Sequence, residues 1–162
     1  MMTEKLTMHK KISLTNLYFN RFLVIRYTTA FFLFLNLYWA TFLIGSLSIV
    51  AILPLALFVL GILTTWEQIK LYRNHCNKLP YARLFYCALM IVFIALMITL
   101  YTPLYQFFFP FLKQTPDALH VLMVLLTVSL IITFLMLRKL NNIQHNRDQH
   151  FKRIQAYEEF IN

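Results

Sequence analysis

The longest apolar stretch of the chain covers residues 27–66 and holds no charged side chain in 40 positions. A single helix of that length would measure roughly 60 Å, about twice the hydrocarbon thickness of a bilayer. The stretch therefore predicts two membrane-spanning helices. Gly45 and Ser46 are turn-favouring residues near its centre, so we expect spans near 27–44 and 46–65.

Two further charge-free runs, 84–112 and 118–137, are each long enough to cross a membrane. The first predicts a third span over about 84–105. Its end is marked by Pro103 and Pro110, which bracket an aromatic segment that we expect at the membrane interface. The second run predicts a fourth span over 118–137.

The segments that flank the spans have helical spacing of their own. Before the first span, SLTNLYFNRFLVIRY (residues 13–27) repeats apolar residues every three to four positions. This segment either lies in the interface as an amphipathic helix or extends the first span. After the fourth span, residues 138–162 contain no Pro or Gly and predict a cytoplasmic helix, with a weak coiled-coil pattern. These boundaries divide the chain into a basic segment (1–26), a four-span domain (27–137) and a helical tail (138–162).

Composition agrees with a membrane protein. The 162 residues are 60% hydrophobic and 13% charged, against about 25% charged residues in soluble domains. The basic N-terminus lacks a short apolar core with a small-residue cleavage site, so we expect the first span to act as an uncleaved insertion signal. The predicted fold class is an all-α integral membrane protein with four transmembrane helices in two hairpins.

Orientation follows from the positions of Lys and Arg, which are retained in the cytoplasm when they flank short loops. With four spans, 14 of the 15 basic residues fall on one side, and only Lys113 lies on the other. Both termini are therefore expected in the cytoplasm of a cell whose plasma membrane holds the protein.

Asp, Glu, Lys and Arg are absent between the predicted span boundaries, and His120 lies near the outer boundary, so proton relays and carboxylate pairs have no candidate there. The remaining polar groups are uncharged. Asn36 and Thr29 lie one heptad apart on the first predicted span, and each needs a hydrogen-bond partner that lipid does not supply. We expect interhelical contacts from Asn36, Thr29, Gln106, Ser129 and Thr133, or a lining role in a pore for Asn36 and Gln106.

Basic residues beside the spans form a second candidate surface, which would bind anionic lipid headgroups or a partner protein, or serve topology alone. Its members are Lys70, Arg73, Lys78, Arg83, Arg138 and Lys139. Nucleic-acid binding is not expected, because these charges lie next to apolar spans.

Catalytic and metal-binding motifs are not found. His145 and His150 are five residues apart, which does not align them on one helix face as metal ligands. Cys76 and Cys87 do not form a disulfide framework or a zinc site. Neither glycine belongs to a phosphate-binding loop. The sequence predicts no catalytic, cofactor or metal site, and the protein is not expected to be an enzyme.

The run KKISLTNLYFNRFLVIRY (residues 10–27), followed by aromatic-rich spans, resembles small four-span membrane proteins of Gram-positive bacteria. Some of these carry a cellobiose phosphotransferase-subunit label. The lactose/cellobiose phosphotransferase component to which that label refers is a soluble helical bundle with a phosphorylated histidine. This chain departs from that pattern almost everywhere, and His75, His145 and His150 lack a motif that would transfer the phosphocarrier role.

Four helices with few internal polar groups do not enclose a wide aqueous path, so we expect a homo-oligomer or a membrane-protein partner. The leading hypothesis is a non-enzymatic accessory or regulatory subunit of a bacterial membrane complex, such as one for transport or envelope maintenance. The alternative is a small oligomeric transporter or channel for an uncharged or weakly polar solute.

Overall fold

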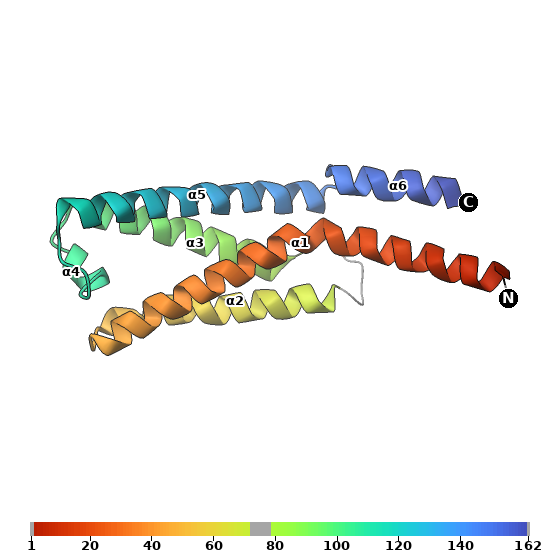
Figure 1. Ribbon diagram of the computed structural model, residues 1–162. Coiled ribbons are helices and arrows are strands. Elements are labelled where there is room, and N and C mark those ends of the chain that lie inside the picture. The colour runs from red at the N-terminus through yellow and green to blue at the C-terminus, as the bar shows by residue number, and fades with distance from the viewer. Residues whose placement is uncertain (1, 72–78, 162) are drawn as a thin grey trace.

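The computed structural model describes residues 2–71 and 79–161, and every regular element in these ranges is helical. Figure 1 shows an elongated arrangement with both termini at one end and the α1–α2 turn and α4 at the other. The elements are α1 (Met2–Gly45), the 3₁₀-helix η1 (Ile49–Ala51), α2 (Ile52–Lys70), α3 (Pro80–Thr99), α4 (Tyr105–Phe108), α5 (Pro116–Gln144) and α6 (Gln149–Ile161).

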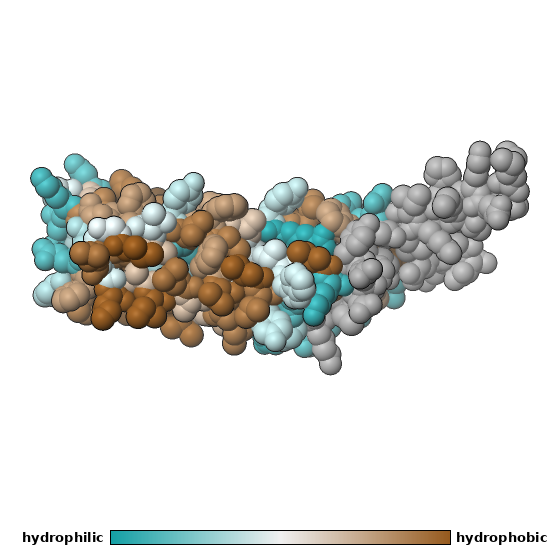
Figure 2. All heavy atoms as spheres, turned by 90° about the horizontal axis from the view of Figure 1, so that it is seen from below, coloured by the Kyte–Doolittle hydropathy of each residue, from teal (hydrophilic) through white to brown (hydrophobic). Residues whose placement is uncertain are grey.

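Four helical segments are long and apolar enough to cross a membrane, which makes this a multi-pass membrane protein. Large apolar side chains are exposed along all of them, as lipid-facing surfaces require. In Figure 2 these side chains gather over the bundle, and hydrophilic residues lie at both ends of the apolar region. The segments are Phe19–Gly45, Ile49–Lys70, Pro80–Thr99 and Pro116–Ala156.

Helix α1 is continuous from Met2 to Gly45. The segment 13–27 is therefore part of the same helix as the first span and not a separate helix. One face of α1 is buried at a spacing of three or four residues, which is the helical period. That face comprises Arg21, Phe22, Ile25, Thr29, Phe32, Asn36, Ala40 and Leu43.

The turn after α1 lies at the predicted place but is longer than expected. Leu47 adopts a left-handed conformation with φ 52°. Its N–H donates to the Ile44 carbonyl at 2.9 Å, and the Ser48 N–H donates to the Leu43 carbonyl at 3.0 Å, which is a Schellman ending. Helix α2 consequently begins at Ile52 and continues to Lys70, not 46–65 as the sequence predicted.

Helix α3 begins with Pro80 at its first turn, where the missing N–H costs nothing. It ends at Thr99 and not near 105, because Pro103 has no N–H to donate to the Thr99 carbonyl. That carbonyl accepts instead from the backbone N–H and the hydroxyl of Thr102, at 3.1 and 3.0 Å.

Helix α5 begins at Pro116, where the Thr115 hydroxyl caps the Ala118 N–H at 3.3 Å. It passes the predicted end at residue 137 and stops at Gln144. Asn146 follows with φ 54°, a conformation that asparagine adopts more readily than most residues. The tail is therefore not one continuous helix, because α6 starts separately after this break.

The helices pack around one apolar core. Phe32 of α1 contacts the rings of Tyr86 and Phe93 of α3, with centroids 6.4 and 5.6 Å apart. Gly61 allows α2 to pack closely against its neighbours, since a Cβ built there would lie 3.4 Å from the Phe85 ring and 3.5 Å from Leu33. The core is thus narrow, and most span side chains face outward.

Candidate functional site

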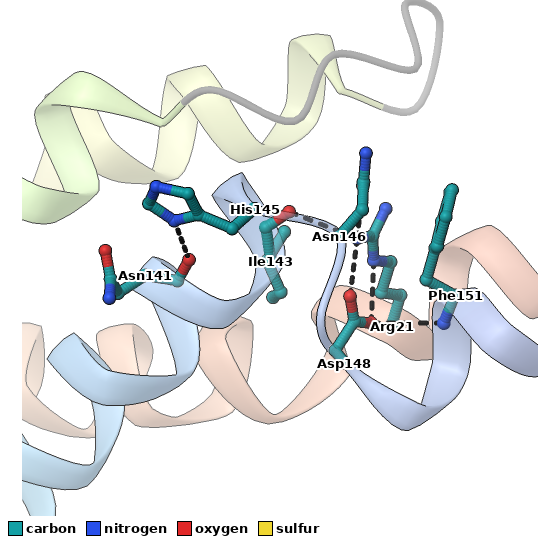
Figure 3. A network of polar contacts seen from close by, with 7 residues as sticks. All are labelled: Arg21, Asn141, Ile143, His145, Asn146, Asp148 and Phe151. Carbon is teal, nitrogen blue, oxygen red and sulfur yellow. Dashed lines mark hydrogen bonds and ion pairs between the residues drawn. The ribbon is translucent and has the colours of Figure 1, made fainter.

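A buried ion pair joins α1 to the break between α5 and α6. The Arg21 guanidinium binds both oxygens of Asp148, with Nη2–Oδ1 at 2.6 Å and Nε–Oδ2 at 2.8 Å. The two side chains are only 1% and 9% exposed. Two-point contacts between ionised groups are the strongest hydrogen bonds in proteins. We call this contact the Arg21 clasp (Figure 3).

The Arg21 clasp includes further groups from the same break. Arg21 Nη2 donates to the Ile143 carbonyl at 3.2 Å and to Asn146 Oδ1 at 3.0 Å. The guanidinium also lies 5.0 Å from the centre of the Phe151 ring, within reach of a cation–π contact. Asp148 Oδ2 accepts the Phe151 N–H at 3.2 Å, which caps the first turn of α6. One arginine thus holds the end of α5 and the start of α6 together.

A second group of buried polar side chains connects α1, α2 and α3. Gln68 Nε2 donates to Thr29 Oγ1 at 3.0 Å, and the Tyr86 hydroxyl lies 3.0 Å from the same Thr29 oxygen. The hydroxyls of Thr29 and Tyr86 both bond the Ile25 carbonyl, at 2.7 and 3.2 Å. We call Thr29, Gln68 and Tyr86 the polar junction. Thr29 is therefore in contact with two other helices.

Glu67 gives the α2–α3 connection a fixed geometry. Its two carboxylate oxygens accept the N–H groups of Ala82 and Tyr81 at 2.9 and 3.3 Å, so it caps the start of α3. The Thr64 hydroxyl approaches the Tyr81 carbonyl at 3.2 Å. Because α2 extends to Lys70, Glu67 lies on a helix and not in the loop that the sequence predicted.

An apolar cavity of about 260 Å³ lies between α1, α3, α5 and the segment around α4. Asn36 is the buried polar residue in its wall, with 3% of the side chain exposed. Its Nδ2 donates to the Phe32 carbonyl at 2.7 Å on its own helix. The remaining walls are mainly leucine and aromatic side chains: Leu35, Tyr38, Trp39, Phe42, Phe93, Leu96, Phe109, Phe111, Leu112, Leu122, Leu125 and Leu126.

The other predicted polar residues lie apart from these groups. Gln106 is exposed on α4 and does not line the cavity, so the structure does not bring it together with Asn36. Ser129 and Thr133 are buried on α5, but the Thr133 hydroxyl bonds the Ser129 carbonyl of the same helix at 2.8 Å. Such a bond does not hold one helix to another.

The predicted basic surface is only partly described. Lys70 is exposed at the end of α2, and Arg83 lies near the start of α3, where it reaches Gln144 of α5 at 3.4 Å. Arg138 is exposed and Lys139 half-buried on α5. Arg73 and Lys78 fall outside the described residues. In the described part of the chain, no group of three His, Cys, Asp or Glu side chains is arranged to hold a metal.

Sequence reasoning missed Gln68, Tyr86 and Asp148 as contact residues. Gln68 could have been found, because it follows Leu57, Gly61 and Thr64 at helical spacing on the buried face of α2. Comparison with protein-family models, curated proteins and solved structures finds no match to this chain. The resemblance to Gram-positive four-span proteins stays a prediction.

Proposed function

We propose that this protein is a non-enzymatic accessory or regulatory subunit of a bacterial membrane complex. The observation that carries the proposal is the Arg21 clasp. By fastening the start of α6 beside α1, it fixes this part of the chain at the end of the structure where both termini lie (Figure 1). A fixed helical surface at a membrane boundary is suited to binding another protein.

The use of buried polar groups supports this proposal. In the polar junction and in the Arg21 clasp, the buried polar side chains bond one another or backbone groups of neighbouring helices. Their geometry joins elements; it does not present a nucleophile with an adjacent base, which covalent catalysis would need. These polar side chains thus hold the helices in place relative to one another.

We further propose two membrane hairpins with both termini cytoplasmic, in the bacterial plasma membrane. The distribution of Lys and Arg supports this orientation. The common end of the two termini in Figure 1 is compatible with it. Anionic headgroups would then neutralise the basic residues beside the spans, among them Lys70, Arg83 and Arg138.

The membrane-facing surface offers room for a partner or a second copy. On α1, aromatic side chains at helical spacing are more than half exposed: Phe31, Phe34, Tyr38 and Phe42 have exposures of 53, 57, 64 and 55%. Aromatic side chains carry large contact areas in helix association.

The experiment is purification of the tagged protein from its native membrane in a gentle detergent, with the mass of the complex and its chains identified. A chain shortened after Arg147 lacks α6 and should lose the partner, whereas full-length Asp117→Asn, changed at an exposed residue, should keep it. A wild-type protein that purifies only with itself would contradict the accessory role.

The alternative function, a small oligomeric transporter or channel for an uncharged or weakly polar solute, is favoured by one observation. The cavity beside Asn36 lies between helices that cross the membrane and has an almost wholly apolar wall. Solute flux into liposomes that contain only the purified protein tests this function. Flux that is present in wild type and lost in Asn36→Leu would favour the transporter over the accessory role.

A further inference from the structure

The cavity beside Asn36 has the features of a ligand site. Its volume of about 260 Å³ exceeds the roughly 150 Å³ of an apolar cavity that takes benzene. In proportion, it has room for roughly ten non-hydrogen atoms. Small-molecule sites are typically apolar pockets with few polar groups, as here.

Asn36 supplies an unused hydrogen-bond acceptor in this wall. Because its Nδ2 faces the Phe32 carbonyl at 2.7 Å, the amide orientation is fixed: an oxygen placed there would meet another acceptor. Among the described residues, no donor bonds the Asn36 side-chain oxygen. An acceptor that faces an apolar cavity without a donor is costly, and a ligand hydroxyl or N–H would remove that cost.

The position of the cavity indicates where a ligand comes from. Figure 1 shows α1 and α5 diverging toward the α4 end of the bundle. An open apolar groove between Phe31 of α1 and one face of α5 shares Leu125 with the cavity. Within a bilayer, such a groove borders on hydrocarbon chains, so lipid lies next to the cavity wall.

Aromatic contacts between α1 and residues 108–111 form part of the cavity wall. Trp39 stacks on Phe109 with centroids 6.2 Å apart, and its Nε1 donates to the Phe108 carbonyl at 3.2 Å. Phe42 stacks on Phe111 at 5.0 Å. A helix is about 10 Å across and would not enter a space of this volume. The occupant that fits is a single alkyl chain.

We propose that this cavity binds an uncharged amphiphile from the bilayer, with its alkyl chain among the leucine and aromatic walls and a hydroxyl or amide N–H donating to Asn36 Oδ1. No ionisable carboxyl or amine lines the cavity, so a charged headgroup has no partner in it. The site goes beyond the proposed accessory role and does not depend on it.

The test uses Trp39 as a reporter in the cavity wall. Full-length Trp66→Phe removes the other tryptophan, which is exposed on α2, and is reconstituted in phosphatidylcholine nanodiscs. The probes are 9-bromononan-1-ol and 1-bromononane, whose bromine quenches indole fluorescence on contact. Each probe is titrated over the same range of mole fractions in the membrane.

We expect saturable quenching by the alcohol, with half-saturation at about threefold to tenfold lower mole fraction than for the bromoalkane, as one hydrogen bond would give. Asn36→Leu should remove this difference. Thr41→Val, a matched change at an exposed residue of the same helix, should leave it intact. Leu126→Phe keeps Asn36 but fills the cavity, and should abolish saturation.

Quenching that rises linearly for both probes, or that saturates equally for both in the Trp66→Phe protein, would overturn the proposal. Should Asn36→Leu fail to fold, as shown by loss of helical circular dichroism, Leu126→Phe decides the matter. Retained saturation with the alcohol in that variant would also overturn the site.

Discussion

Replacement of Asp148 by asparagine removes the charge that balances Arg21 and turns one of the two oxygens that accept from Arg21 into an NH₂ donor. Asparagine has nearly the shape of aspartate and is an equally favoured helix N-cap, so the cap on the Phe151 N–H is retained. Arg21 keeps the Ile143 carbonyl and Asn146 as acceptors. The substitution therefore tests the two-point contact between Arg21 and Asp148, charge and hydrogen bond together.

The magnitude follows from burial. Exposed ion pairs contribute about 0–1 kcal/mol, whereas breaking a buried pair costs about 3–5 kcal/mol because one charge stays buried alone. Arg21 and Asp148 are 1% and 9% exposed, but the two remaining acceptors and the Phe151 ring offset part of the loss. We expect about 3 kcal/mol, which is on the order of a hundredfold in the equilibrium for detaching α6.

Hydrogen exchange of the α6 amides, measured by mass spectrometry on the full chain in nanodiscs, reports that equilibrium. In Asp148→Asn, exchange across residues 151–156 should accelerate on the order of a hundredfold, while exchange across residues 122–136 of α5 stays unchanged. Arg21→Met combined with Asp148→Asn should recover part of the protection, because no unpaired charge remains.

Equal exchange in Asp148→Asn and in the control Asp117→Asn would refute this reasoning. Asp117 is exposed at the start of α5, and its neutralisation changes charge without touching the Arg21 clasp. Such a result would mean that the buried ion pair contributes no more than a surface pair does.

Three further substitutions test the fold through thermal unfolding in detergent. Gln68→Leu should lower the free energy of unfolding by about 0.6–1.7 kcal/mol, the range for hydrogen bonds between membrane helices. Its effect should be non-additive with that of Thr29→Val, and strict additivity would argue against the polar junction. Leu47→Gly should raise the free energy of unfolding by about 0.5–1 kcal/mol, because the left-handed backbone strains leucine and the leucine side chain is 95% exposed. A Tm lower than that of the wild type would contradict the turn geometry. Tyr105→Phe should leave the free energy of unfolding unchanged or raise it by about 1 kcal/mol, since the buried Tyr105 hydroxyl has no hydrogen-bond partner among the described residues. A clear loss of stability would show that the hydroxyl is bonded.

Much of the helical organisation could be predicted, because length and charge alone limit what crosses a bilayer. The charge-free runs located four apolar helices, and Gly45–Ser46 located the first turn. The sequence also predicted that Pro103 marks the end of the third span. Proline removes the hydrogen-bond donor for the carbonyl four residues before it, however, so α3 already ends at Thr99. The residue at which a helix ends depends on which backbone carbonyl loses its hydrogen-bond donor. The length of a charge-free run does not show this.

The polar contacts were harder to predict, because each joins residues far apart in the chain. Arg21 and Asp148 are 127 positions apart, and their pairing depends on the left-handed turn at Asn146, which redirects the chain into α6. Thr29 was identified from its heptad relation to Asn36, yet the same buried face continues to Arg21. Following that face beyond the predicted span boundary would have marked Arg21 as buried and in need of a counter-ion.

The two ends of the bundle are held by different kinds of contact, and this difference bears on how a chain could enter the cavity. Hydrogen bonds and an ion pair hold α6 against α1, and hydrogen bonds in the polar junction hold α1, α2 and α3 together. These contacts weaken steeply when donor and acceptor move apart. Toward α4, α1 is held by the ring contacts Trp39–Phe109 and Phe42–Phe111, each worth about 0.5–1.5 kcal/mol, and by one hydrogen bond from Trp39 Nε1 to the Phe108 carbonyl. Stacked rings tolerate sliding better than hydrogen bonds tolerate stretching. Separation of α1 from residues 109–111 at the cavity should therefore occur without detaching α6, and the hydrogen exchange of α6 should be the same with and without a bound amphiphile.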